Sequence, residues 1–381
     1  MGSTVSIENS STVVRARHWR DRPFSHAIVV YVLARVVTLL AVALVELVTH
    51  HGLVHDLSRW DGKWFLEAVH HGWPRVLPRI HGHVRANPIA FFPLFPLLLR
   101  SLTFLTTVSS SVMGLVVSGV TGLTGVVAVG LLTKEFAGAQ KAERAALLFA
   151  VSPGSFVFNL IYAEGLIVTF VALGLLALMR RRWWLAGLLG ALATATSPVA
   201  LAFVVSCVVS SFIAIRRHRQ WRSLAAPLLA PLGIVAWMGY LWWHTGNLMA
   251  WRLTEHDGWK SQFSLMYPVH ILAKFIGNPL SPTMTGQMLV AGTAISIVGL
   301  VVAFRERQPA PLLVYATSAV VLFACSEPVG LRPRFVMLAF PLVIAAATRW
   351  NGWRYRSIVA LSTLLLVLMT IESLGSSAVF P

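Results

Sequence analysis

The segment Ser25–Val48, with the sequence SHAIVVYVLARVVTLLAVALVELV, decides the fold class of this chain. It is long and apolar enough to cross the hydrocarbon core of a bilayer, which takes about 20 helical residues. The rest of the chain has the same character, because 56% of its 381 residues are hydrophobic and only 12% are charged. This composition excludes a soluble globule of ordinary make-up. The sequence therefore predicts an all-α, polytopic membrane protein.

Further apolar runs predict about eleven transmembrane helices, within a range of about 9 to 13. The runs after the first are Ser111–Thr133, Ala145–Leu160, Ile161–Met179, Trp183–Ala195, Val199–Ile215, Leu224–Trp243, Met288–Phe304, Pro311–Ala324, Phe335–Thr348 and Ile358–Ile371. Several are short for a bilayer core, so they must be tilted, broken or extended into their flanks. We expect residues 1–24 to form a cytoplasmic N-terminal segment and residues 25–381 to form a single transmembrane domain.

Clusters of Lys and Arg alternate with the apolar runs, as the positive-inside rule requires. The clusters are Arg15–Arg22, Lys134–Arg144, Arg180–Arg182, Arg216–Arg222, Arg305–Arg307 and Arg349–Arg356. The alternation predicts a cytoplasmic N-terminus, an outer C-terminus, and three outer loops at 49–110, 244–287 and 326–334. Most of the net charge of +17 is explained by anchoring at the inner leaflet, so it does not indicate a nucleic acid partner.

The segment Ala90–Thr107 is also apolar enough to span, but a span there would place Lys134–Arg144 outside. We therefore expect it to form juxtamembrane helices on the outer membrane surface, where prolines and aromatic residues are tolerated and Arg100 can snorkel. The alternative is a true span, with the short helix Ala145–Ala150 not crossing.

The first outer loop carries the chemistry-bearing motif Arg59-Trp60-Asp61-Gly62-Lys63-Trp64-Phe65. Asp61 is flanked by aromatic rings that suit a sugar face and by cations that suit a phosphate. A base that deprotonates an acceptor hydroxyl is what a glycosyl transfer needs, and one carboxylate suffices for an inverting displacement. We expect Asp61 to be this base, with Trp60 and Trp64 as sugar-binding residues. The structural alternative for Asp61 is a helix N-cap.

The outer loops hold more cations than the positive-inside rule explains, which indicates an anionic ligand such as a phosphate. Contact with anionic lipid headgroups is the alternative. The candidate phosphate-binding residues are Arg59, Lys63, Lys260, Arg332 and Arg334. His71 and His256 belong to a set of outer-loop histidines that we expect to hydrogen-bond phosphate or sugar hydroxyls, and the alternative for any one of them is a surface histidine without a function. There is no His-Glu-x-x-His or Asp-x-Asp motif, so we expect no metal or other cofactor, a divalent cation being the alternative.

Several motifs together resemble the bacterial relatives of the PIG-V mannosyltransferases, integral membrane glycosyltransferases of the GT-C class. They are Trp60-Asp61-Gly62-Lys63-Trp64-Phe65, His71-Gly72-Trp73-Pro74, Phe91-Phe92-Pro93-Leu94-Phe95-Pro96, Pro153 with Tyr162-Ala163-Glu164-Gly165, and Arg332-Pro333-Arg334-Phe335 before Phe340-Pro341. The likeness extends from about Arg35 to Pro341, and its specific part is Trp-Asp-Gly with the Phe-Phe-Pro-Leu-Phe-Pro block.

The resemblance implies a GT-C-like fold in the plasma membrane of a bacterium, with its active site on the outer face. It implies a polyprenyl-phosphate sugar donor, usually of mannose, and a lipid- or protein-linked acceptor. Asp61 matches the essential acid of the first outer loop, and Arg332 and Arg334 match basic residues that hold the donor phosphate. Glu164, with Tyr162, matches a Tyr-x-Glu motif that contacts sugar or acceptor. Where relatives show an Arg-Pro pair, this chain has Ser197-Pro198, so the contact of that arginine is in doubt.

A transporter or flippase of a lipid-linked anion is the alternative function. Its signature would be charges within the spans and broken helices in two related halves. Arg35 lies inside the first run, and Pro153, Pro198 and Pro231 are able to break helices, yet no inverted repeat is visible.

Overall fold

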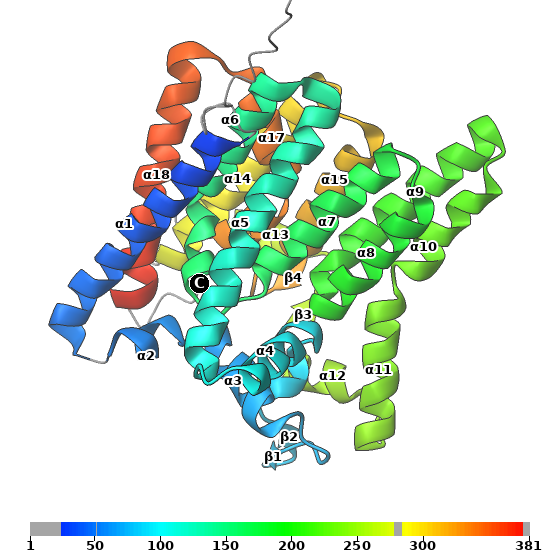
Figure 1. Ribbon diagram of the computed structural model, residues 1–381. Helices are drawn as coiled ribbons and strands as arrows, with labels where there is room; N and C mark the ends of the chain where they lie inside the picture. Colours follow the sequence, from blue (N-terminus) through cyan, green and yellow to red (C-terminus); the bar gives the residue numbers. More distant parts are fainter. Residues whose placement is uncertain (1–23, 51, 278–283, 376–381) are drawn as a thin grey trace, which may run out of the picture.

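The computed structural model describes residues 24–50, 52–277 and 284–375, which fold into a bundle of helices (Figure 1). The α-helices are α1 (Ser25–Thr49), α2 (Leu53–Leu57), α3 (Asp61–His71), α4 (Leu94–Leu105), α5 (Ser110–Ala137), α6 (Ala139–Ala150), α7 (Glu164–Met179), α8 (Trp183–Thr196), α9 (Leu201–His218), α10 (Ala225–Leu229), α11 (Leu232–Thr245), α12 (Ala250–Leu253), α13 (Tyr267–Gly277), α14 (Met284–Arg305), α15 (Ala310–Ala324), α16 (Pro333–Leu338), α17 (Pro341–Arg349) and α18 (Gly352–Gly375). The all-α fold that the composition predicts is confirmed.

Short elements connect these helices. Strand β1 (Arg79–Ile80) pairs antiparallel with β2 (His83–Val84), and β3 (Gln262–Phe263) pairs antiparallel with β4 (Ser326–Glu327). The helical turns are η2 (Pro88–Ala90), η3 (Pro153–Asn159), η4 (Pro198–Ala200), η5 (Trp221–Leu224) and the π-helical turn η6 (Thr254–Gly258). The β3–β4 pair joins the second outer loop to the third, with Gln262 opposite Glu327.

Helix α1 forms because its sequence is a long, mostly apolar run, and it packs against α18 and α6. Arg35, inside this run, is buried. Its guanidinium donates hydrogen bonds to the Ser155 carbonyl, to Ser155 Oγ at 3.0 Å and to the Ala150 carbonyl at 3.4 Å. A charge inside a membrane is costly unless polar groups surround it, so these bonds explain why Arg35 is tolerated. Arg35 thereby fixes the turn η3 against α1.

The run Ala145–Leu160 is not one continuous helix, and it is one of the short runs that are broken. Helix α6 ends at Ala150, and the separate turn η3 begins at Pro153. Turn η3 is bent by 117° relative to α7. Proline has no N–H to continue a helical ladder, so the chain turns at this position although it stays apolar. The break places Tyr162 and Glu164 at the corner where α7 begins.

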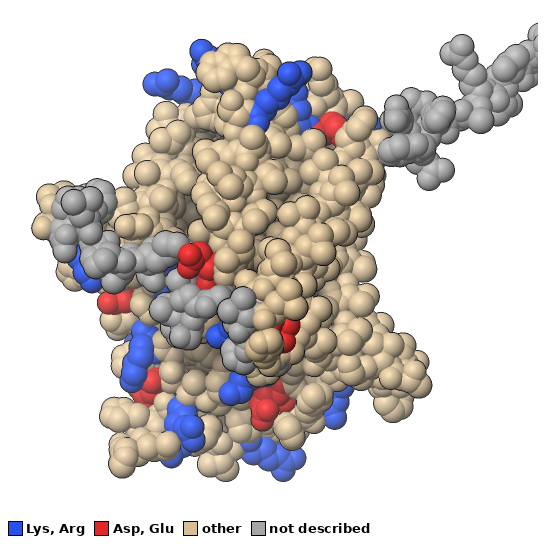
Figure 2. Space-filling model, turned by 90° about the vertical axis from the view of Figure 1, so that its left-hand side faces the viewer, with Lys and Arg blue, Asp and Glu red and all other residues tan. Residues whose placement is uncertain are grey.

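The cluster Arg15–Arg22 lies outside the described residues. The other predicted basic clusters lie at one end of the bundle, at the top of Figure 1. Arg180 in the α7–α8 turn pairs with Glu135 of α5 at 2.6 Å. Arg349 at the end of α17 pairs with Glu306 at 3.4 Å, and His26 at the start of α1 lies 3.7 Å from Glu143 of α6. Figure 2 shows Lys and Arg at both ends of the molecule, with a belt of mostly uncharged residues between them.

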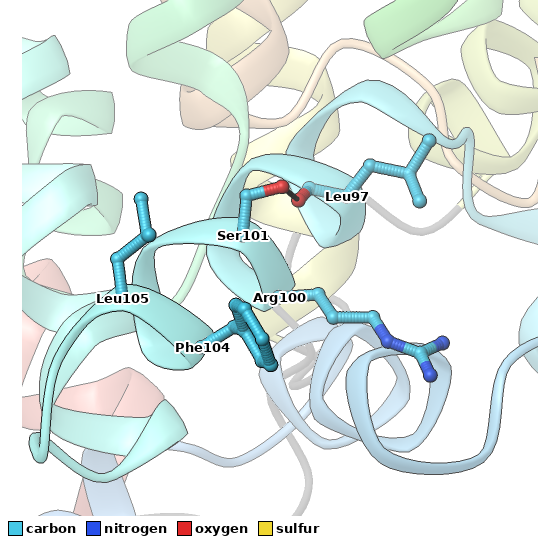
Figure 3. Close-up of a pocket in the computed structure, with 5 residues that line it drawn as sticks. All are labelled: Leu97, Arg100, Ser101, Phe104 and Leu105. Carbon is cyan, nitrogen blue, oxygen red and sulfur yellow. Dashed lines mark hydrogen bonds between the residues drawn. The ribbon is translucent and has the colours of Figure 1, made fainter.

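The first outer loop folds at the opposite end, where α2, α3, α4 and the β1–β2 hairpin lie together (Figure 1). Helix α4 has 12 residues and therefore extends only about 18 Å, which is short of a bilayer core of about 30 Å. Figure 3 shows the α4 side chains that line a shallow pocket of ≈ 390 Å³, with Phe104 88% exposed and Leu105 76% exposed. This apolar face suits a helix that lies at the membrane surface.

Five helices in the described residues are long and apolar enough to cross a membrane: Ser25–Leu47, Ser110–Ala137, Pro198–His218, Gly286–Arg305 and Gly352–Ser373. The number rises to seven if each of two bent pairs is counted as one span. The predicted number of about eleven spans is not confirmed and stays a prediction, because helices such as α8 and α15 have fewer than 18 residues.

A cysteine placed at Ala137 should react only with membrane-permeant thiol reagents in intact cells, because Ala137 lies at the end that carries the basic clusters. A cysteine at Arg217 should behave in the same way, whereas one at Val76, whose side chain is 81% exposed in the first outer loop, should react with an impermeant maleimide. The native Cys207 and Cys325 are buried and are first replaced by alanine. Labelling of the Ala137→Cys variant by the impermeant reagent would overturn the topology.

Candidate functional site

The motif residue Trp60 sets the direction in which α3 begins. Its backbone has φ 59° and ψ −123°, a region that aromatic residues rarely adopt. Two contacts hold it there: the indole N–H donates to the Ser373 carbonyl of α18 at 3.2 Å, and the Arg59 guanidinium lies 5.2 Å from the ring centre. Asp61 is thus the first residue of α3 rather than its N-cap, and a carboxylate is favourable at this end of the helix dipole.

Asp61 forms an ion pair with Arg334, a residue 273 positions away in the sequence. Arg334 Nη1 lies 2.8 Å from Asp61 Oδ2, and Arg334 Nε lies 3.7 Å from Glu164 Oε1. The three side chains are 25%, 13% and 9% exposed for Asp61, Arg334 and Glu164. One guanidinium therefore joins the first residue of α3, the first residue of α7 and the start of α16. We call Asp61, Glu164 and Arg334 the acid–arginine cluster.

The surroundings fix the guanidinium of Arg334 in place. Its central carbon lies 5.1 Å from the Tyr162 ring centre and 4.5 Å from that of Phe335. Ser118 Oγ lies 3.0 Å from both the backbone nitrogen and the carbonyl oxygen of Tyr162. The Tyr162 hydroxyl accepts a hydrogen bond from the Asp61 backbone N–H at 3.4 Å. Burial acts to lower the pKa of Arg334, but Asp61, Tyr162 and Glu164 outweigh it and raise the pKa above its usual value.

A close backbone contact between η3 and the start of α16 brings the segment Arg332–Arg334 to the site. A Cβ on Gly154 of η3 would lie 2.4 Å from the Pro333 carbonyl oxygen and 2.8 Å from the Arg334 Cα. Glycine is therefore the residue that lets η3 and α16 touch. The position of Arg334 thus depends on the sharp turn after α6, because Gly154 in that turn packs against Pro333 and Arg334.

Arg332 lies beside the acid–arginine cluster but differs from Arg334 in its contacts. Its Nη2 donates to the Pro328 carbonyl at 3.4 Å. Burial and the neighbouring Arg334 charge lower its pKa, although Asp61 and Tyr267 act in the opposite direction. The two arginines thus place two positive charges close to Asp61.

The aromatic residues of the motif make different contacts. Trp64 packs edge to face on Trp259 of the second outer loop, with ring centres 5.3 Å apart, and Trp259 contacts Phe91 at 5.6 Å. Lys63 Nζ lies 5.5 Å from the Trp64 ring centre. Trp64 and Trp259 therefore form an aromatic pair one helical turn from Asp61, built from two loops. We call this pair the tryptophan pair.

Other candidate residues lie apart from the acid–arginine cluster. His71 pairs with Glu67 at 3.4 Å near the far end of α3, and His256 pairs with Asp257 at 2.9 Å, which also accepts a hydrogen bond from the Val84 N–H. In the described part of the chain, neither histidine forms a hydrogen bond or ion pair with Asp61, Glu164 or Arg334. Arg59 lies 3.9 Å from the buried Asp56, and Lys260 is exposed.

Glu255 is a site residue that sequence reasoning missed. It lies in η6, and its side chain hydrogen-bonds Ser261 and interacts electrostatically with Asp61. Nothing in the spacing of Thr254-Glu255-His256-Asp257 relates it to a residue in another loop. Ser118 and Trp259 were missed for the same reason, since each contributes through a contact between distant segments. Among the described residues, no group of three or more His, Cys, Asp or Glu side chains is arranged to hold a metal ion, and the expectation that the protein needs no metal stays a prediction.

Replacing Glu255 by glutamine should stabilise the protein at pH 8 but hardly at pH 4. Burial and the Asp61 charge raise the pKa of Glu255 from 4.5 to about 7. Between these values the folded protein binds more protons at Glu255 than the unfolded chain does, so stability falls as pH rises through this window. The gain at pH 8 is expected to be about 1–3 kcal/mol. Thermal unfolding of both proteins at the two pH values measures it, and an equal difference at both would contradict the assignment.

Comparisons with known proteins agree with this architecture. Against GPI alpha-1,6-mannosyltransferase 2 of Mus musculus, the chain is 32% identical over 157 residues, which are 37% of this chain and 29% of the mouse protein. The crystal structure of ArnT from Cupriavidus metallidurans bound to undecaprenyl phosphate superposes with a TM-score of 0.52 and 15% identity, covering 88% of this chain and 62% of ArnT. The chain thus spans less than two thirds of either relative, and the ArnT likeness confirms the predicted GT-C-like fold.

The sequence profile of the Mannosyltransferase (PIG-V) family matches residues 24–239, a range that contains α1, the first outer loop and the start of α7. Asp61, Tyr162 and Glu164 lie within this match, and Arg334 reaches them from outside it. The chain is therefore a multi-pass membrane protein that belongs to the PIG-V mannosyltransferase family.

Proposed function

We propose that this protein is a glycosyltransferase that moves a sugar, mannose by preference, from a polyprenyl-phosphate donor to a lipid- or protein-linked acceptor. The reaction takes place at the outer membrane face and inverts the configuration of the sugar carbon. The observation that carries the proposal is the acid–arginine cluster, in which Asp61 lies 2.8 Å from Arg334 at the end of the bundle opposite the basic clusters.

The chemistry assigns one role to each charged group. Asp61 takes the proton of the acceptor hydroxyl while the oxygen of that hydroxyl bonds to the sugar carbon. The bond between the sugar carbon and the donor phosphate oxygen breaks at the same time, and the phosphate leaves with the electron pair. Arg332 and Arg334 stabilise the negative charge that develops on this phosphate. The tryptophan pair offers an apolar surface near Asp61 for a sugar ring.

Arg334 suits this reaction because a guanidinium has five donors in a planar fork. Nη1 of Arg334 donates a hydrogen bond to Asp61, while its Nε is buried and has no hydrogen-bond partner. The side chain is therefore able to bind a phosphate oxygen and still orient the base. Glu164, 3.7 Å from Nε, balances the arginine charge and lies where a sugar or acceptor hydroxyl can reach it.

The relatives support the donor class and the sugar. The ArnT structure contains undecaprenyl phosphate, and the mouse relative is a mannosyltransferase. A phosphate held by arginines is also the ligand that the cations of the outer loops fit.

The direct test uses membranes that contain the full chain together with their own acceptors. Radiolabelled polyprenyl-phosphate mannose should transfer its label to a lipid or protein acceptor and release polyprenyl phosphate, and polyprenyl-phosphate glucose should be a poorer donor. The anomeric configuration of the product, determined by NMR, should be opposite to that of the donor. Movement of the lipid-linked sugar across liposomes without any transfer would instead support the transporter.

A further inference from the structure

Two loops at the basic end of the bundle are folded against each other. In the α7–α8 turn, Arg181 has φ 55°, and the Arg182 N–H donates to the Ala177 carbonyl at 2.8 Å. In the α9–η5 loop, Arg219 has φ 53°, and the Gln220 N–H donates to the Ala214 carbonyl at 3.3 Å. The left-handed conformation turns the chain sharply in both loops.

Side-chain contacts keep these loops together. Arg181 Nη2 and His218 Nε2 lie 3.2 Å apart, which ties the end of α7 to the end of α9. The hydroxyl groups of Ser211 and Ser223 lie 2.9 Å apart and join η5 to α9. The loops are thus fixed parts of the fold.

The two loops line a pocket of ≈ 530 Å³ that is open to solvent at the end of the bundle. Its lining residues are Arg181, Trp183, Arg219, Gln220, Trp221 and Arg222. Three of the six are arginines and none is acidic. Trp183, which is 9% exposed, is a buried residue in the lining of the pocket. We call this space the arginine pocket.

The three arginine side chains are exposed, and together they give this space a positive potential that attracts an anion. A phosphate group is the natural anion, because its oxygens match the planar donor fork of a guanidinium. The volume lies within the range of about 300–1,000 Å³ that is usual for sites of small molecules.

The position of the arginine pocket indicates a lipid rather than a soluble anion. It lies at the C-terminal end of the candidate span Pro198–His218, the end that carries a basic cluster. Trp221 is 66% exposed and Trp184 67% exposed, as expected for aromatic side chains at headgroup level. Phe212 is 58% exposed, and the Arg216 guanidinium lies 5.3 Å from the centre of its ring. We propose that the arginine pocket binds the phosphate headgroup of an anionic phospholipid from the leaflet at the basic end.

The test compares two triple variants of the full chain in nanodiscs. The pocket variant combines Arg181→Gln, Arg219→Gln and Arg222→Gln. The control combines Arg305→Gln, Arg307→Gln and Arg354→Gln, which removes the same charge from exposed positions at the same end and includes a left-handed residue, Arg307 with φ 50°. Binding of spin-labelled phosphatidylglycerol in a phosphatidylcholine background is measured by electron paramagnetic resonance.

The pocket variant should lose about tenfold in relative lipid affinity for each arginine that no longer donates a charge-assisted hydrogen bond to the phosphate, while the control stays close to wild type. Equal weakening of both variants would show only a general electrostatic attraction and would overturn the proposal. Displacement of the labelled lipid by inorganic phosphate at low millimolar concentration would assign the pocket to a soluble anion and would also overturn it. If the triple variant unfolds, Arg222→Gln alone gives the same comparison, because its side chain is exposed. None of these outcomes depends on sugar transfer.

Discussion

Replacing Asp61 with asparagine is expected to lower the rate of sugar transfer by about 10²–10⁴-fold, the loss that follows from removing a positioned base. Asparagine keeps the size of the side chain and one oxygen that accepts a hydrogen bond from Arg334, whose Nη1 lies 2.8 Å from Asp61 Oδ2. It cannot take the acceptor proton. Donor binding should persist, because Arg332 and Arg334 keep their charges.

The matched control is Glu67→Gln, which removes a carboxylate from the same helix. Glu67 is 47% exposed and pairs with His71 rather than with Arg334, so this variant should retain normal turnover. Donor affinity and turnover are measured separately on purified protein, together with thermal unfolding to confirm that both variants are folded. Near-normal turnover by Asp61→Asn would remove Asp61 from the catalytic role.

The long helices could be predicted from the sequence because a span is a local property. The run Ser25–Val48 corresponds to α1, Ser25–Thr49, and the run Ser111–Thr133 lies within α5, Ser110–Ala137. The length and position of these helices follow from the apolar composition of each run, and each run ends where polar residues begin. Apolar composition does not show the break at Pro153, because the chain stays apolar through η3. The proline indicates that a helix can break there, and only the packing of Gly154 against α16 shows where the chain turns next.

The candidate site, too, could be predicted from the sequence only in part. Asp61 stands out in the sequence because its neighbours Trp60, Lys63 and Trp64 are of unusual type for an outer loop. Its pairing with Arg334 and the approach of Glu255 depend on how four distant segments pack, and no local pattern contains that information. The structure adds which of the two arginines contacts Asp61.

Arg334 is expected to be the more sensitive of the two arginines. It is 13% exposed and lies between Asp61 and Glu164, so Arg334→Ala would leave two largely buried carboxylates without their cation. Breaking a buried pair in this way costs about 3–5 kcal/mol, and the partial exposure of Asp61 places the expected loss at the lower end. The Arg332→Ala variant removes a hydrogen bond to a backbone carbonyl and should destabilise the protein less.

The informative variant for function is therefore Arg334→Lys, which keeps a positive charge near both carboxylates. A lysine cannot bind Asp61 and a phosphate oxygen through one planar fork, so it should lose at least one charge-assisted hydrogen bond to the donor, worth about 1.5–3 kcal/mol. Donor affinity should fall by about 10- to 150-fold. Arg332→Lys should weaken donor binding less, because Arg334 donates directly to Asp61, whereas Arg332 donates to the backbone carbonyl of Pro328.

A double-mutant cycle separates the two roles that we assign to Arg334. If Arg334 both orients Asp61 and binds the phosphate, Arg334→Lys should weaken donor binding in the wild-type and Asp61→Asn backgrounds alike, since donor binding does not need the base. Its effect on turnover should shrink once Asp61 is already asparagine, because neighbouring residues that act together are not additive. If the Arg334→Lys and Arg332→Ala variants both bind polyprenyl-phosphate mannose as tightly as wild type, the arginines do not hold the donor phosphate. Arg334 would then serve only to position Asp61 and Glu164.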